Sequence, residues 1–498
     1  MIPPDATTQG APGGGAAIEL NEFESLLTKE FKARDVQKQS AVQTAVRTLA
    51  EQALATSKSI SPDVIKTISA IISEIDRKIS EQVNLIMHHE EFKQLEGSWR
   101  GLHHLVNNTE TDEMLKIRVL NISKNDLKKT LKKFEGTAWD QSPIFKKLYE
   151  DEYGSPGGQP YGSIVGDYHF DHGAEDVRML ANMAQIAAAA HAPFIAGAAP
   201  TSLGMDSWQE LSNPRDLTKI FQSPEYASWR SLRESEDARY LGLAMPRFLS
   251  RLPYGSKTVP VEEFNFEEDT AGADHNKYVW SNAAYAMATN ITRAFKLYGW
   301  CARIRGTESG GVVEGLPVHT FPTDDGGVDM KCPTEIAITD RREAELAKNG
   351  FMPLSHYKNT DYAVFMGAQS LQKPAVYDDP DATANANLAA RLPYLFATCR
   401  FAHYLKCMVR DKVGSFKERA DMEQWLNKWI HQFTCDSSSS EEMKARYPLG
   451  EAKVEVNEVK GNPGYYSSKF YLRPHYQLEG LTVSLRLVSK LPSAKGGG

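Results

Sequence analysis

The chain has 498 residues with 57 Lys or Arg against 64 Asp or Glu, a formal net charge of −7, and 41% hydrophobic residues. This composition is typical of a globular protein of two to four domains with a sizeable core. A nucleic-acid-binding surface would need clustered basic residues, which the sequence lacks, so we expect no nucleic-acid partner. A membrane span would need about 20 consecutive apolar residues, which the sequence also lacks, so we expect no insertion into a membrane.

The first 60 residues are predicted to form a flexible tail and short helices. Residues 1–16 are rich in Pro, Gly, Ala and Thr, a composition that buries too little apolar surface to fold, and they lack the layout of a secretory signal. We therefore expect a cytoplasmic protein. An amphipathic helix over 18–31 would place three apolar residues on one face: Leu26, Leu27 and Phe31. A helix this short is marginal alone, so it either packs or is recognised by a partner.

The segment 61–110 is predicted to form one long helix that continues through His88 and His89, and it contains the longest periodic pattern in the sequence. Ser61 and Pro62 suit a helix start. After them, β-branched residues recur every three or four positions, the spacing of a coiled-coil seam: Ile65, Ile68, Ile72, Ile75, Ile79, Val83 and Ile86. Such a helix packs either inside its own domain or against another chain. The polar opposite face and the position next to a tail favour another chain.

Residues 111–380 are predicted to form an α/β domain. An alternating strand over 114–123 precedes a lysine-rich helix near 124–134. A strand over 161–170, an alanine-rich helix over 175–191 and a strand over 192–200 then read as a βαβ unit.

A histidine- and aspartate-rich motif in this unit raises the question of a metal site. "GDYHFDH" nearly matches the HxHxDH signature of zinc-dependent hydrolases, through Asp167, His169, Asp171 and His172. Distant histidines such as His191 or His319 would have to complete the ligand set. However, the first position is Asp, and acidic residues also suit a helix start. We therefore favour a strand, turn and helix start with no metal or other cofactor, and keep a zinc-dependent hydrolase as the alternative.

Catalytic motifs of other kinds are absent from the sequence. It contains no Walker A motif, no GxSxG elbow, no GxGxxG after a strand and no CxxC pair. The sequence therefore predicts a protein that is not an enzyme.

Two further segments are candidates for contacts with other chains. A short helix over 340–349 would present charges on its exposed side, either as a solvated face or for docking: Asp340, Arg341, Arg342, Glu343 and Glu345. Residues 381–498 are predicted to contain a helical block over 384–432, followed by strands. The last strand has four apolar residues on one face: Leu481, Val483, Leu485 and Leu487. As an edge strand it would be exposed unless another subunit pairs with it.

Several long blocks of the sequence carry a resemblance to a known family. They include "EQVNLIMHHEEFKQLEGSWRGLHHLV", "AAHAPFIAGAAP", "DSWQELSNPRDLTKIF" and "ESEDARYLGLAMPRFLSRLPYG". In these blocks the chain resembles the large subunit of the type VI secretion contractile sheath, the TssC/VipB family. The resemblance implies a mixed α/β or α+β fold with an N-terminal helical arm, a sheath core with an inserted middle domain, and C-terminal strands for a sheet between subunits.

The resemblance also implies partners for the predicted segments. Family members pair with a small sheath subunit (TssB/VipA), and the heterodimers stack on a baseplate as a helical tube around an inner tube of Hcp. Contraction propels the inner tube, and a ClpV-type AAA+ ATPase dismantles the contracted sheath. On this chain, the seam from Ile65 to Ile86 would bind the small subunit, and the strand from Leu481 to Leu487 would join neighbouring subunits. The helix with Leu26, Leu27 and Phe31 would be read by ClpV, and the charged helix from Asp340 to Glu345 would face the inner tube.

Overall fold

The computed structural model describes Thr44, Thr48 and residues 64–213, 216–270, 274–323, 325–415, 418–458 and 466–477. The chain divides into two compact units. The first contains the residues through Gly97 together with Leu249–Trp280 and Pro317–Lys331, and the second contains Ser98–Phe248, Ser281–Leu316 and the residues from Cys332 onward. Both helices and strands are abundant, and the predicted mixed α/β class is confirmed.

A six-stranded mixed sheet forms the centre of the second unit. Its strands follow the order β1 (Ile164–Phe170), β2 (Phe194–Ala198), β3 (Leu241–Met245), β9 (Phe351–His356), β10 (Ala363–Phe365) and β6 (Val312–Val313). The first four are parallel, and β10 and β6 are antiparallel to their neighbours. Helix α7 (Ala174–Ala190) joins β1 to β2, so the predicted βαβ unit is confirmed.

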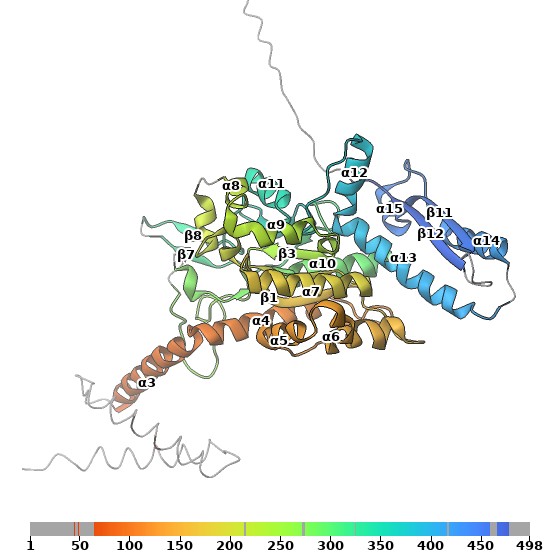
Figure 1. The fold of residues 1–498 in the computed structure, drawn as a ribbon. Helices are drawn as coiled ribbons and strands as arrows, with labels where there is room; N and C mark the ends of the chain where they lie inside the picture. Colours follow the sequence, from red (N-terminus) through yellow and green to blue (C-terminus); the bar gives the residue numbers. More distant parts are fainter. Residues whose placement is uncertain are drawn as a thin grey trace, which may run out of the picture. The chain divides into compact units, whose positions relative to one another are not determined.

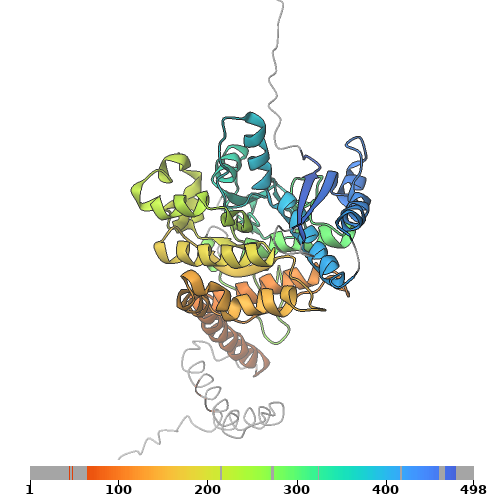
Figure 2. The same cartoon turned by 45° about the vertical axis from the view of Figure 1, so that its right-hand side comes forward.

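Helices cover both faces of this sheet, as Figures 1 and 2 show. On one face a core forms around α7, α5 (Lys124–Lys133), α9 (Ala227–Glu234) and α11 (Asp340–Lys348). On the other face a second core forms around α10 (Ala283–Tyr298) and the first turns of α13 (Leu392–Asp411). The central strands are buried on both sides because both faces are covered, which explains the uniformly apolar β2 and β3.

The last third of the chain adds a smaller core to the second unit. An antiparallel pair, β11 (Leu449–Glu458) and β12 (Tyr466–Pro474), packs against α14 (Arg419–Ile430) and α13. The short helices α6 (Pro143–Phe145), α8 (Leu217–Ile220) and α15 (Glu441–Arg446) lie in connections, and α12 (Pro380–Ala389) has no buried residue.

The first unit contains α3 (Val64–Met87) and the first half of α4 (Glu90–Asn107), together with a hairpin of β7 (Thr320–Pro322) and β8 (Val328–Met330). Two further strands, β4 (Phe248–Leu249) and β5 (Trp280–Ser281), form a two-stranded sheet. The sequence suggested that one helix continues through His88 and His89, but a turn at these residues separates α3 from α4. Among the described residues, we find no helix with the length and apolar character that a membrane span requires.

The predicted strand over 114–123 does not form. Leu115 and Ile117 are half-buried and Lys116 and Arg118 exposed, so the alternation is real, but no described strand pairs with this segment. Side chains fix it instead, because Lys116 donates from Nζ to Gln159 Oε1 at 2.9 Å and Arg118 pairs with Glu152. The pattern indicated the buried side at Leu115 and Ile117 but not at Val119, which is 67% exposed, and it did not indicate whether a strand pairs with this segment.

Candidate assembly surfaces

Helix α3 exposes part of the predicted seam. Ile72 is 53% exposed and Ile86 50%, whereas Ile75, Ile79 and Val83 are half-buried. Ile65 and Ile68 lie within the helix, but their side chains are outside the described residues. Arg77 forms ion pairs with Glu74 and Glu81 along the same helix. The five described seam residues are therefore all accessible to some degree, as an assembly surface requires.

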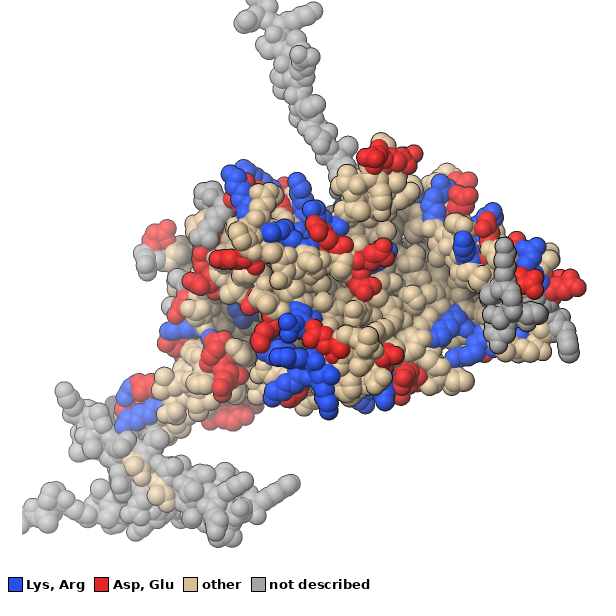
Figure 3. All heavy atoms as spheres, viewed as in Figure 1, with Lys and Arg blue, Asp and Glu red and all other residues tan. Residues whose placement is uncertain are grey.

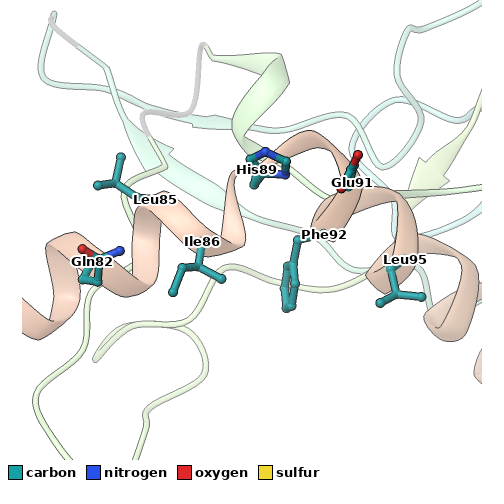
Figure 4. Close-up of a pocket in the computed structure, with 7 residues that line it drawn as sticks. All are labelled: Gln82, Leu85, Ile86, His89, Glu91, Phe92 and Leu95. Carbon is teal, nitrogen blue, oxygen red and sulfur yellow. The ribbon is translucent and has the colours of Figure 1, made fainter. Parts of the chain in front are cut away.

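An apolar groove continues this stripe past the end of α3. It has a volume of about 440 Å³, and seven residues line it: Gln82, Leu85, Ile86, His89, Glu91, Phe92 and Leu95. In Figure 4, Ile86, Phe92 and Leu95 point to the same side of the two helices. Leu85 is 70% exposed and Leu95 56%, which is unusual for leucine beside other apolar groups. The sequence did not predict this groove, because the groove depends on the turn at His88 and His89 where α3 ends.

A buried charge cluster joins α4 to the segment around Glu268 within the first unit. Arg251 Nε lies 2.6 Å from Glu96 Oε1 on α4, and its Nη1 lies 2.6 Å from Glu268 Oε2. The three side chains are 8%, 13% and 1% exposed. Burial lowers the pKa of Arg251, but the hydrogen bonds to Glu96 and Glu268 outweigh it and raise that pKa above its ordinary value.

The same unit holds the segment around Glu268 against α3. Asn84 Nδ2 donates to the carbonyl of Glu267 at 3.0 Å, and the N–H of Asp269 donates to Asn84 Oδ1 at 2.8 Å. On α4, a Cβ added to Gly97 would lie 2.5 Å from the carbonyl oxygen of Trp280. These contacts fix α3 and the first turns of α4 at the point where the groove forms.

The charged helix α11 presents fewer charges than predicted. Asp340 is exposed and Arg341 is 89% exposed. Arg342 is 16% exposed, pairs with Glu345 at 2.6 Å and donates from Nη2 to the carbonyl of Asn213 at 2.7 Å. Burial, together with the nearby Asp340, raises the pKa of the Glu343 carboxyl. Only Asp340 and Arg341 therefore point fully to solvent.

The sheet of β11 and β12 has one edge covered by side chains. Asn427 on α14 accepts from the N–H of Val454 at 2.9 Å and donates to its carbonyl at 2.8 Å. Glu423 accepts from the N–H of Val456 at 3.0 Å, and Arg419 donates to its carbonyl at 3.0 Å. The outer edge of β11 is thus occupied. In the described part of the chain, no strand pairs with the outer edge of β12.

Two of the predicted contact sites lie outside the described residues. They are the C-terminal strand with Leu481, Val483, Leu485 and Leu487, and the N-terminal helix with Leu26, Leu27 and Phe31.

The histidine and aspartate motif forms a turn rather than a ligand cluster. Asp171 Oδ1 accepts from the N–H of Gly173 at 2.7 Å, and the N–H of Asp171 donates to Asp176 Oδ2 at 3.0 Å. His172 stacks on Tyr226 with ring centroids 4.2 Å apart, and its Nδ1 lies 2.9 Å from the carbonyl of Thr201. The favoured interpretation, a strand end followed by a helix start, is confirmed by β1 and α7.

The remaining candidate ligands have other environments. Asp167 accepts from Asn282 Nδ2 at 3.3 Å, and burial lowers the pKa of His169 to about 4. His191 caps the C-terminus of α7, and His319 Nδ1 lies 2.7 Å from the hydroxyl of Tyr278. Across the residues that the structure describes, no three His, Cys, Asp or Glu side chains come together as a metal site. The structure therefore offers no support for the hydrolase alternative.

The charged side chains of the second unit form patches of both signs. On the face shown in Figure 3, blue side chains gather over α5, which carries Lys128, Lys129, Lys132 and Lys133. Acidic side chains gather at α12, next to Asp378 and Asp379 and including Asp381.

Two family models match most of the chain. The model described as "EvpB/VC_A0108, tail sheath N-terminal domain" matches residues 69–372, and "EvpB/VC_A0108, tail sheath gpW/gp25-like domain" matches 381–491. The chain is thus a tail sheath protein. It is 71% identical over 492 residues to the type VI secretion system sheath protein TssC1 of Pseudomonas aeruginosa, which covers 98% of this chain and 99% of that protein. The chain belongs to the TssC/VipB family of type VI secretion sheath proteins, as its sequence blocks predicted.

Solved structures give lower similarities. A chain of the anti-feeding prophage baseplate matches with a TM-score of 0.39 and 10% identity, covering 76% of this chain and 84% of that one. A chain of the contracted sheath of an extracellular contractile injection system, PVC, matches with a TM-score of 0.31 and 10% identity, covering 59% and 63%.

Proposed function

We propose that this sheath protein pairs with a small sheath subunit (TssB/VipA) through the apolar stripe of α3 and the groove beside it. The heterodimers then polymerise in the cytoplasm, on a baseplate, into a helical tube around an Hcp inner tube. Contraction of the tube moves the inner tube outward, and the sheath itself catalyses no reaction. The observation that carries this proposal is the exposed stripe from Ile72 to Leu95, since large apolar side chains gathered on two helices mark an interaction surface.

The size of the stripe fits a stable contact. Its five most exposed members, Ile72, Leu85, Ile86, Phe92 and Leu95, are 40% to 70% exposed. Complete burial of such a side chain stabilises by about 1.5–3 kcal/mol, so covering the remaining half contributes roughly 1 kcal/mol each. The five together would contribute roughly 5 kcal/mol before the costs of association.

Substitution on α3 tests the pairing. Ile72→Asp combined with Ile79→Asp should abolish co-purification with the small subunit, because the pairing would bury two carboxylates without partners. Ser73→Asp is the matched control, since Ser73 is exposed on the same helix. If the double variant co-purified with the small subunit as before, the seam would pack inside its own domain and would not bind the small subunit.

Strand addition is the proposed link between neighbouring subunits. We place it on the outer edge of β12, because side chains from α14 already occupy the backbone groups at the outer edge of β11. The strand added would be the segment with Leu481, Val483, Leu485 and Leu487 of a neighbouring copy. Backbone pairing suits this task because it can persist while the attached domains rotate.

Contacts with the inner tube and with the ATPase complete the proposal. Asp340 and Arg341 are the exposed members of the predicted charge cluster on α11, and they would attract an inner tube weakly enough to release it. The segment with Leu26, Leu27 and Phe31 would be read by a ClpV-type ATPase. A peptide of residues 18–35 should then bind the N-terminal domain of that ATPase, and a peptide that fails to bind removes this part of the proposal.

A further inference from the structure

The outer face of helix α5 in the second unit carries three lysines without a counter-charge. Leu127 and Leu131 are 4% and 3% exposed, so they anchor the inner face of the helix in the core. Lys129, Lys132 and Lys133 are exposed and belong to the basic patch over α5 in Figure 3. Among the described residues, no acidic side chain forms an ion pair with these three lysines. The patch is therefore a positive surface on a firmly packed helix.

An acidic segment with little packing of its own forms the start of α12. Asp378, Asp379 and Asp381 are exposed, and no described lysine or arginine forms an ion pair with them. Just before them, Val376 is 84% exposed and Tyr377 is 54% exposed. None of the ten residues of α12 is buried. Because a helix of this length takes most of its stability from packing, a surface that covers α12 would stabilise it.

The two charged surfaces lie on opposite sides of the second unit. In Figures 1 and 2, α12 lies above the central sheet and α5 below it, with α7 between them. The lysines and the aspartates of one chain therefore do not meet. A helical assembly repeats one contact between two different surfaces, one from each of two neighbouring copies. Two surfaces of opposite charge on opposite sides of one unit meet this requirement.

We propose that the lysine face of α5 binds the acidic start of α12 in a second copy of this chain. The contact rests on the proposed function, the assembly of this chain into a helical tube. Each copy presents its lysines to one neighbour and its aspartates to another, so the contact repeats along the tube. Attraction between the ammonium and carboxylate groups acts over about 10 Å at 0.1 M salt, and it selects which surfaces of two copies meet.

Charge reversal and rescue test this contact in the full chain co-expressed with its small sheath subunit. Lys129→Glu combined with Lys133→Glu should abolish long tubes in electron micrographs, because like charges then face each other across the contact. Asp378→Lys combined with Asp381→Lys should do the same. Asp379 is kept, because its side chain caps α12 by accepting from the N–H of Asp381 at 3.0 Å. All four substitutions together should restore tubes, since surfaces of opposite charge meet again.

Matched controls separate this contact from other effects of the substitutions. Lys129→Arg combined with Lys133→Arg keeps both charges, so this variant should form tubes as the unsubstituted chain does. Co-purification with the small subunit should be unchanged in every variant, because neither surface includes the apolar stripe of α3. The melting temperature shows whether each variant is folded, and the folded variants decide if one of them does not fold.

The outcomes distinguish this contact from the proposed function. If the unsubstituted chain and its small subunit formed no tubes, the proposed assembly itself would be wrong. If the unsubstituted chain formed tubes and either folded charge reversal formed them equally well, only the contact between α5 and α12 would be wrong. A folded variant with all four substitutions that still formed no tubes would also overturn it, because the lysines would then have a partner other than α12.

Discussion

Arg251→Ala is expected to loosen the attachment of α4 to the segment around Glu268 in the first unit. The arginine forms two ion pairs of 2.6 Å, to Glu96 and to Glu268, and a cation–π contact with Tyr254 at 4.6 Å. Alanine would leave two carboxylates that are 13% and 1% exposed without their cation.

The size of the effect follows from burial. Breaking a buried ion pair by removing one partner costs about 3–5 kcal/mol, because the remaining charge is neither paired nor solvated. Since each 1.36 kcal/mol is a factor of ten, local opening should become about two to four orders of magnitude more frequent. Lys453→Ala is the matched control, because Lys453 and Glu455 also lie close, at 2.7 Å, but are 65% and 37% exposed. Solvent screens an exposed pair of this kind, so its loss should leave the frequency of opening unchanged.

Hydrogen exchange followed by mass spectrometry measures this opening directly. Peptides covering 84–97 and 251–269 should lose protection in Arg251→Ala and keep it in Lys453→Ala. If protection in these peptides were unchanged in a folded Arg251→Ala variant, the cluster would not hold α4 and the segment around Glu268 together.

Three further predictions follow from single features. His403 is 3% exposed, its Nε2 donates to the carbonyl of Ala190 at 2.9 Å, and burial lowers its pKa to about 4. Since an unfolded histidine titrates near pH 6.5, the unfolded state binds the proton first, and stability falls as the pH drops from about 6.5 to about 4. Relative to His403→Gln, the unsubstituted chain should lose about 3 kcal/mol of unfolding free energy over this range. The same pH dependence of unfolding free energy in both proteins would contradict this prediction. Deleting residues 481–498 should prevent long tubes but leave small-subunit binding intact, and tubes of normal length would exclude strand addition. Arg341→Glu should weaken retention of the inner-tube protein on sheath subunits, with Lys348→Glu as a control, and equal retention by both variants would exclude α11 as the contact.

The βαβ unit could be predicted because its signals are local. The strand ending at Phe170, the turn at Asp171 and the alanine-rich helix each have a recognisable pattern, and the structure confirms them. The same reasoning assigned the histidine and aspartate motif to a turn, where Asp171 Oδ1 accepts from the N–H of Gly173.

Other strands of the sheet were harder to predict. β3 is a five-residue strand that directly follows a charged helical segment, and β9 contains Pro353, a residue that argues against a central strand. Their identity depends on pairing between residues more than 100 positions apart, such as Leu243 with Phe351, which no local pattern records.

The candidate surfaces also include features that a local sequence pattern predicts and features that depend on tertiary contacts. The spacing of the seam predicted an amphipathic α3, and the helix forms there. The groove at Phe92 and Leu95 depends on where α3 ends, and the turn at His88 and His89 was not predicted. On α11, the sequence could not reveal that Arg342 and Glu345 pair with each other instead of facing solvent.

Electron microscopy of the full chain co-expressed with its small sheath subunit addresses the proposed assembly. We expect long helical tubes in lysates of cells that make both proteins, and no tubes with Ile72→Asp and Ile79→Asp in the large subunit. Separate, unassembled subunits from the unsubstituted pair, or tubes formed equally well by the double variant, would contradict assembly through the apolar stripe of α3.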